Sequence, residues 1–295
     1  MTDTKRYLNK PTRQSACYTQ RDLLLYAQGI GCEELRFTYE HDENFAAFPT
    51  FPLTLLFSGM DQDVVSFPSE FMQEAPPMPP LKGVVTGLDG ERYIEFFKPL
   101  PTEATEVVVS QQITGVHKRG KGASVETEAT ICDSAGEKYC RIVSGAFLVG
   151  AKDFKDSGIS NSMKLSPPQR PADAIAEIAT SKAQAQLYRL SGDYNPLHIS
   201  PEFAKMVGFG EPILHGLCTF GMSARAVLKT FASNDVGQLK SLRVRFSKPV
   251  LPGQTLEVHM WHEQGRVVFI TKVKETGAVV INNACAELGS ATSRL

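Results

Sequence analysis

Three polar side chains that could carry acid-base chemistry lie close together in the second half of the chain. The stretch YRLSGDYNPLHISPEFAK, residues 188–205, contains Asp193, Asn195 and His198, with a glycine before them and a proline among them. Glycine ends a helix and Asn-Pro favours a turn, so we expect these side chains on a rigid turn between two short helices. An Asp and a His held side by side can accept and deliver protons. The same residues would also serve as cap, turn former and hydrogen-bonded partner without any chemistry.

The segment that follows this turn offers a candidate site for a developing negative charge. GEPILHGLCTFG, residues 210–221, leads from a loop into an apolar helix, and Gly216 falls at or near the first turn of that helix. Backbone N–H groups there have no intrahelical acceptor, and the helix dipole is positive. Such an N–H suits a carbonyl oxygen that gains charge. Close packing against a sheet would also explain Gly216. It would likewise explain Gly221 inside the helix, where glycine is roughly 1 kcal/mol less favourable than alanine.

The two halves of the chain repeat each other. Lys98-Pro99 aligns with Lys248-Pro249, and each copy has a strand ending in Lys-Pro, a turn, a strand rich in β-branched residues and a Gly-containing hairpin. The apolar helix of the second copy is apolar or small almost all round, which is typical of a buried helix. We therefore expect an α+β double hotdog, in which each half is a curved antiparallel sheet wrapped around a central helix.

The composition between the two copies indicates where they are joined. Residues 1–150 are expected to form the first half and residues 172–295 the second. Residues 151–171 between them are rich in Ser, Pro, Lys and Asp, have little periodicity, and are expected to be a linker.

The copies differ at the positions that could carry chemistry. Gly31 stands where Asp193 stands in the second half, no His follows at the matching distance, and FPTFPLTLLF, residues 48–57, lacks the His-Gly step. If these residues were needed for the fold, both copies should keep them. The difference predicts one active site per chain, with the first half doing another job. Pro49 and Pro52 are expected to loosen its helix.

The catalytic segment as a whole is similar to a known family signature. SGDYNPLHISPEFAKMVGFGEPILHGLCTFG, residues 191–221, resembles the signature of the (R)-specific enoyl-CoA hydratases of the MaoC-like hydratase family. The first half is also similar to this family, so the resemblance covers almost the whole chain. It is greatest to the eukaryotic peroxisomal double-hotdog type, in the free-standing form of the hydratase part of the multifunctional β-oxidation enzyme. The pattern G-D-x-N-P-x-H followed by H-G-L is highly specific, and the sequence does not depart from it.

The resemblance implies a function and a role for each candidate residue. The reaction is the reversible hydration of trans-2-enoyl-CoA to (3R)-3-hydroxyacyl-CoA in fatty-acid β-oxidation, without metal or other cofactor. Asp193 and His198 are the implied catalytic dyad, Asn195 the support for water and dyad, and Gly216 the source of the oxyanion-hole N–H. The family also suggests a homodimer. With catalysis assigned to the second half, the first half, residues 1–150, is expected to make room for the acyl chain and CoA.

Two other functions known for hotdog proteins stay open at this point, because fold alone does not settle function. One is an acyl-CoA thioesterase, which would need a carboxylate or nucleophile aimed at C1. The other is a non-catalytic acyl-CoA-binding protein, which would have no reason to keep the Asp-Asn-His turn in one half only.

The phosphates of CoA call for a local cationic patch. VHKRGKGA supplies Lys118 and Lys121 in a first-half hairpin, and SLRVRFSK supplies Arg245 in a second-half strand. We expect these three residues to contact CoA, although each run could simply be a solvated face.

The bulk composition excludes several classes of protein. A formal net charge of -1 over 295 residues argues against a general nucleic-acid binder. The six cysteines show no metal-ligand spacing and are expected to be reduced thiols of an intracellular protein. The longest apolar stretch, residues 45–57, contains two prolines and is too short to span a bilayer.

The end of the chain resembles a targeting signal. Ser293, Arg294 and Leu295 are similar to the Ser-Lys-Leu peroxisomal address, with Arg replacing Lys as the cation. They predict a peroxisomal location and the peroxisomal import receptor as a partner. A tail that ends this way by chance is the alternative.

Overall fold

A single antiparallel sheet runs through both halves of the protein in the computed structural model, which describes residues 2–289. The first half contributes β1 (Thr12–Tyr18), β3 (Thr105–Arg119), β4 (Gly122–Cys132), β5 (Lys138–Val149) and β2 (Thr86–Phe96), in that spatial order. The second half continues with β8 (Leu239–Phe246), β11 (Val279–Leu288), β10 (Arg266–Val273), β9 (Thr255–Glu263) and β7 (Ala174–Ala179). A two-residue strand, β6 (Ser157–Gly158), pairs with β3.

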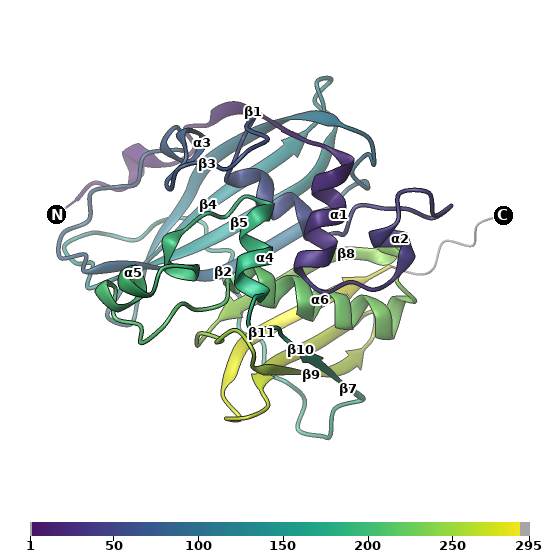
Figure 1. Cartoon of the computed structure of the whole chain (residues 1–295). Helices are drawn as coiled ribbons and strands as arrows, with labels where there is room; N and C mark the ends of the chain where they lie inside the picture. The colour runs from purple at the N-terminus through teal and green to yellow at the C-terminus, as the bar shows by residue number, and fades with distance from the viewer. Residues whose placement is uncertain (1, 290–295) are drawn as a thin grey trace.

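The halves meet where β2 pairs with β8. The two strands are antiparallel, with Glu91 opposite Arg245 and Glu95 opposite Ser241. Counted outward from this seam, the strands of the second half follow the same order as their counterparts in the first. This is the double hotdog that the sequence predicts, and the fold prediction is confirmed (Figure 1).

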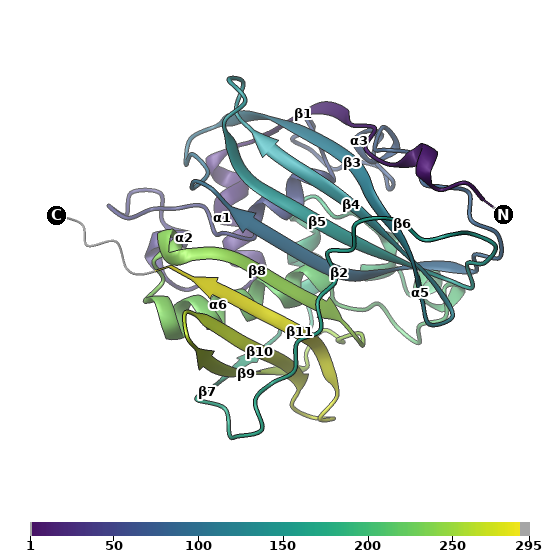
Figure 2. The same cartoon turned by 180° about the vertical axis from the view of Figure 1, so that it is seen from behind.

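The helices lie on one face of the sheet, as the opposite views of Figure 1 and Figure 2 show. They are α1 (Gln20–Gly29), α2 (Leu35–Thr38), α3 (Glu70–Gln73), α4 (Gln184–Tyr188), α5 (Pro201–Met206) and α6 (Gly216–Ala232). Short 3-10 turns complete them: η1 (Lys5–Tyr7), η2 (Phe51–Leu56), η3 (Arg189–Ser191), η4 (Pro196–His198) and η5 (Val236–Gln238). No helix within residues 2–289 is long and apolar enough to cross a membrane.

The central helix is complete in the second half only. Twelve of the 17 residues of α6 are buried, which explains its nearly continuous apolar and small composition. In the first half the matching segment is the six-residue 3-10 turn η2, with Pro52 in its first turn and Pro49 just before it. Proline is well tolerated in the first turn of a helix, so the two prolines explain where this turn begins but not why it ends after six residues.

The segment expected to be a linker, residues 151–171, is held against the sheet. Figure 2 shows it crossing the face opposite the helices. Asn161 accepts a hydrogen bond on its carbonyl from Arg243 (2.6 Å), and its main-chain N–H donates to Glu126 (2.7 Å). The division into 1–150, 151–171 and 172–295 stays a prediction.

Gly221 lies where α6 meets a helix of the other half. A Cβ atom at this position would be 2.6 Å from Cγ2 of Ile30 and 3.0 Å from the hydroxyl oxygen of Tyr26. The expectation that Gly221 packs against the sheet is therefore wrong, because its nearest neighbours belong to α1 and the residue that follows it. The glycine lets helices of the two halves approach closely.

Gly221→Ala tests this contact. Overpacking a tight core typically costs about 1–3 kcal/mol, which outweighs the roughly 1 kcal/mol gained in helix propensity. We expect the free energy of unfolding in urea to fall by about 1 kcal/mol or more. Gly210→Ala is the matched control, because a Cβ there has nothing within 4 Å. A Gly221→Ala variant that is more stable than the wild type would contradict the close helix contact.

Candidate active site

The polar turn places its side chains by local hydrogen bonds. Gly192 has a φ of 121°, a conformation that side chains rarely permit, and Asp193 follows it directly. The main-chain N–H of Asn195 donates to Oδ1 of Asp193 (3.2 Å). The side-chain oxygen of Asn195 accepts from the N–H of Leu197 (3.0 Å) and so caps η4. Asn195 therefore holds the Asp193 carboxylate with its backbone and shapes the turn with its side chain.

His198 is fixed in one tautomer. Its Nδ1 lies 2.8 Å from the carbonyl oxygen of Ile213. Because a carbonyl oxygen can only accept, Nδ1 must carry the hydrogen and Nε2 keeps a free lone pair. His198 is buried, and it lines the same cavity as Asp193.

Asp193, His198 and His215 come together, as each offers one nitrogen or oxygen atom within 4.8 Å of the others. The rings of His198 and His215 stack, with centroids 3.7 Å apart and planes 26° from parallel. Each ring also has one nitrogen hydrogen-bonded to a carbonyl oxygen. Stacked rings hold their lone pairs in nearly parallel planes, which is a poor geometry for two ligands of one tetrahedral metal ion. The arrangement suits proton transfer better than metal binding.

Burial sets the charges of the dyad. It raises the pKa of Asp193 from 3.8 to about 6, against the opposing effects of the Asn195 N–H and Arg92. It lowers the pKa of His198 to about 4, although the hydrogen bond to Ile213 opposes this. Near pH 7.5 the pair is therefore an ionised carboxylate beside a neutral imidazole. Both present lone pairs, so one water molecule could donate a hydrogen bond to each.

Gly216 begins α6 and lies beside the cavity. His215 is the N-cap residue, so Gly216 occupies the first helical position, and no acceptor for its N–H is found within residues 2–289. A Cβ here would meet the ring of Phe246 at 3.3 Å, a tight contact. The structure thus supports both interpretations of Gly216, an available amide in a positive helix terminus and close packing against a neighbour.

The cavity above these groups has a volume of about 560 Å³ and is built from both halves. Its walls are mostly apolar, and they include residues that the sequence did not single out: Phe57, Phe67, Met72, Met78, Leu197, Phe209, Ile213 and Phe246. A mostly apolar cavity with a few convergent polar groups is typical of a small-molecule site.

Two charged residues of the first half reach the same cavity. Asp89 and Arg92, both on β2, line it and form an ion pair with an Oδ1–Nη1 distance of 2.5 Å. Arg92 acts on Asp193 by lowering its pKa. The sequence analysis did not identify these residues, because LDGERYIEF, residues 88–96, contains no functional motif and predicts only a strand.

The residues expected to contact CoA do not line the cavity. Lys118 and Lys121 are exposed at the β3–β4 hairpin. Arg245 is paired with Glu91 and donates to the hydroxyl of Ser162 (3.1 Å), which belongs to the segment crossing the opposite face of the sheet. Lys248, which follows β8, is exposed and does line the cavity. It is therefore a better placed cation for a bound anion than the three that the sequence suggested.

Comparison with known proteins covers both halves. Residues 17–150 match the MFE-2 hydratase 2 N-terminal domain and residues 164–284 match the MaoC like domain. A protein of Arabidopsis thaliana named "Enoyl-CoA hydratase 2, peroxisomal" is 36% identical over 90% of this chain and 88% of its own length. The chain belongs to the MaoC-like family.

Two further members of this family are similar to this chain over most of its length. The MaoC-like dehydratase structure from Phytophthora capsici is 42% identical, with a TM-score of 0.94 over 99% of this chain and all of that one. The mouse protein named "Peroxisomal multifunctional enzyme type 2" is 41% identical over 93% of this chain. The chain spans only 37% of the length of that relative.

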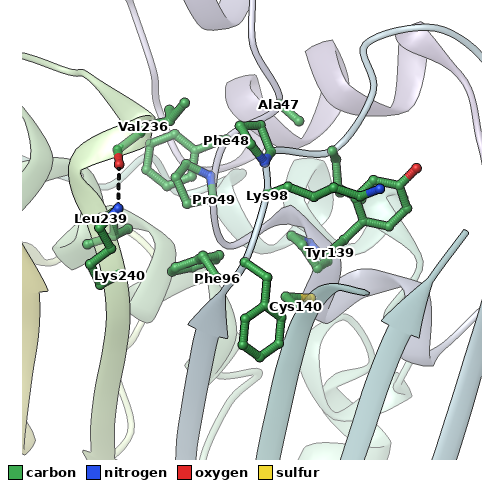
Figure 3. A pocket seen from close by; sticks show the side chains of 15 residues that line it. Ala47, Phe48, Pro49, Phe96, Lys98, Tyr139, Cys140, Val236, Leu239 and Lys240 are labelled. Atoms are coloured by element: carbon green, nitrogen blue, oxygen red, sulfur yellow. Dashed lines mark hydrogen bonds between the residues drawn. The ribbon is translucent and has the colours of Figure 1, made fainter. Parts of the chain in front are cut away.

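This MaoC-like chain also has a smaller pocket, lined mostly by first-half residues that include counterparts of cavity residues. The second half contributes Val236, Gly237, Leu239 and Lys240 to it. Phe96 to Leu100 stand there where Phe246 to Val250 stand in the cavity, and the volume is about 70 Å³. Figure 3 shows Phe48, Pro49 and Phe96 gathered round it. Lys98 at its edge is paired with Asp133 and Glu137. None of the residues lining it is an Asp, Glu or His, so this pocket has no acid-base pair.

Asp193→Asn tests the buried charge. The folded-state pKa of about 6 exceeds the ordinary 3.8, so the folded protein binds this proton more tightly than the unfolded chain. Burial of the carboxylate therefore lowers stability above pH 6, and the penalty fades as the pH falls toward 4. We expect the variant to gain roughly 2–3 kcal/mol in free energy of unfolding at pH 7.5 and little at pH 4, by urea denaturation.

The control for this variant is Asp61→Asn, at an exposed aspartate, which should change stability at neither pH. A loss of stability in Asp193→Asn at pH 7.5 would mean that the neighbouring groups stabilise the carboxylate more than burial destabilises it.

Proposed function

We propose that this protein catalyses the reversible hydration of trans-2-enoyl-CoA to (3R)-3-hydroxyacyl-CoA in fatty-acid β-oxidation. The observation that carries the proposal is the ionised Asp193 beside the neutral His198 at the wall of a large apolar cavity, with the Gly216 amide nearby. The cavity accommodates the acyl chain, and the polar groups gather at one place on its wall.

The chemistry follows from these groups. A water molecule donates hydrogen bonds to the Asp193 carboxylate and to Nε2 of His198, which leaves its oxygen free to attack C3 of the enoyl group. One dyad member takes a proton from the water as the C3–O bond forms, and that same proton is delivered to C2, which leaves both members unprotonated as before. The Gly216 N–H hydrogen-bonds the thioester oxygen while that oxygen carries enolate charge. The dyad ends each turnover as it began, so the reaction needs no metal or other cofactor.

The family relationship supports the substrate class and the location. The Arabidopsis relative is named for enoyl-CoA hydration and for the peroxisome, and it matches this chain over nearly its full length. The expected peroxisomal address, Ser293, Arg294 and Leu295, lies outside the described residues. Recognition of this tripeptide by the import receptor and assembly into a homodimer are further parts of the proposal.

The first half has a supporting role in this proposal. It supplies apolar wall residues and the Asp89–Arg92 pair to the cavity, and the smaller pocket is lined by no Asp, Glu or His. We therefore propose one catalytic site per chain, with Lys248 as a cation available to the phosphates of CoA.

A spectrophotometric assay tests the function. With a trans-2-enoyl-CoA, we expect the enoyl absorbance to fall reversibly without release of free CoA, and the product to be the (3R)-hydroxy thioester. His198→Gln should lower kcat by at least about 100-fold, because it removes a proton carrier. Release of free CoA would instead identify a thioesterase. Binding without turnover would identify an acyl-CoA-binding protein, and either result would refute the hydratase proposal.

A further inference from the structure

His215 has no part in the reaction proposed above, yet it contacts both members of the dyad. It is completely buried, and its ring stacks on His198 at a centroid distance of 3.7 Å. Its Nε2 lies 3.2 Å from the main-chain carbonyl oxygen of Asp193. Because a carbonyl oxygen accepts, Nε2 carries the hydrogen and His215 donates to Asp193.

The ring is enclosed on its other sides as well. The ring of Tyr188 lies 4.9 Å from it, at an interplanar angle of 52°. Burial, reinforced by His198, lowers the pKa of His215 well below its ordinary value. His215 is therefore neutral under assay conditions, and the two stacked rings do not repel each other as cations.

Packing alone does not explain a histidine at this position. Its Nδ1 is buried and has no hydrogen-bond partner within residues 2–289. A buried polar atom without a partner typically costs about 1–3 kcal/mol, a penalty that a phenylalanine would avoid while filling similar space. What histidine adds is the Nε2–H donor to the Asp193 carbonyl.

The hydrogen bond from Nε2 of His215 restrains the main chain directly after a glycine. Asp193 follows Gly192, whose φ of 121° belongs to a region that glycine enters freely. His215 is also the N-cap residue of α6, so the same residue directly precedes the Gly216 amide. Three groups of the reaction are thus tied to a single buried residue.

We propose that His215 is a positioning residue for hydration. Its Nε2–H holds the main chain of Asp193 and its ring supports the imidazole of His198, directly before the helix that carries the Gly216 amide. This inference rests on the proposed hydratase function and assigns to His215 no contact with the substrate.

Two variants separate the donor from the ring. His215→Phe keeps an aromatic ring and loses the donor, whereas His215→Gln places an amide N–H near the position of Nε2 and loses the ring. We expect kcat to fall about 10–100-fold in His215→Phe, with KM within about three-fold of wild type, because small displacements of catalytic groups are costly. His215→Gln should recover part of the loss. His262→Phe is the matched control, since His262 also lies against an aromatic ring, Phe231 at 5.4 Å, but does not line the catalytic cavity.

A double-mutant cycle distinguishes positioning from a general structural role. If the His215 donor acts through Asp193, His215→Phe should lower kcat less than about two-fold further in an Asp193→Asn background. An equal loss in both backgrounds, or a wild-type kcat in both single variants, would overturn the proposal. If His215→Phe does not fold, His215→Gln, which loses the ring stacked on His198, goes through the corresponding cycle with His198→Gln.

A second readout does not depend on turnover. Nitrogen-15 NMR of the histidine rings should show His198 as the Nδ1–H tautomer in the wild type and shifted His198 ring signals in His215→Gln, where the supporting ring is lost. Unchanged His198 signals in both His215 variants would overturn the positioning role. A wild-type protein that does not hydrate enoyl-CoA, but does show these NMR changes, would refute the proposed function and leave the positioning role standing.

Discussion

The pairing of β2 with β8 is the interaction on which the rest of the structure depends. It joins two five-stranded arrays into one sheet and so lets residues of both halves face a common cavity. Asp89 and Arg92 lie on β2, whereas Phe246 and Lys248 lie on or just after β8. Without this seam, the second half would lose one wall of its cavity.

Burial is the second constraint, and it gives the dyad its character. If it were exposed to water, Asp193 would have its ordinary low pKa and would be a weak base. An exposed His198 would have a pKa close to neutral and would be partly protonated. In the cavity wall the same burial raises one pKa and lowers the other, so two proton acceptors lie side by side. This arrangement lowers the free energy of unfolding, because a buried carboxylate and the Nδ1 of His215, which has no hydrogen-bond partner within residues 2–289, both destabilise the fold.

Much of this could be predicted from the sequence, for physical reasons. The repeat around Lys98-Pro99 and Lys248-Pro249 revealed the double hotdog, and the Asp-Asn-His turn is local enough for spacing to place it. Pairings between distant segments could not be predicted, since no local pattern shows that Arg92 reaches the cavity or that Gly221 packs on α1. The partners of the cations expected near CoA could not be predicted for the same reason: composition identified Arg245, but only the sheet shows that it pairs with Glu91. The CoA contacts of Lys118, Lys121 and Arg245 stay a prediction.

The central claim is that two similar halves make one catalytic site, and its stoichiometry is measurable. Isothermal titration of the purified full-length chain with a non-reactive thioether analogue of enoyl-CoA should give one site per chain, because the smaller pocket of about 70 Å³ is lined by no Asp, Glu or His and its Lys98 is already paired. Two equivalent sites per chain would contradict the claim, as would one site for every two chains.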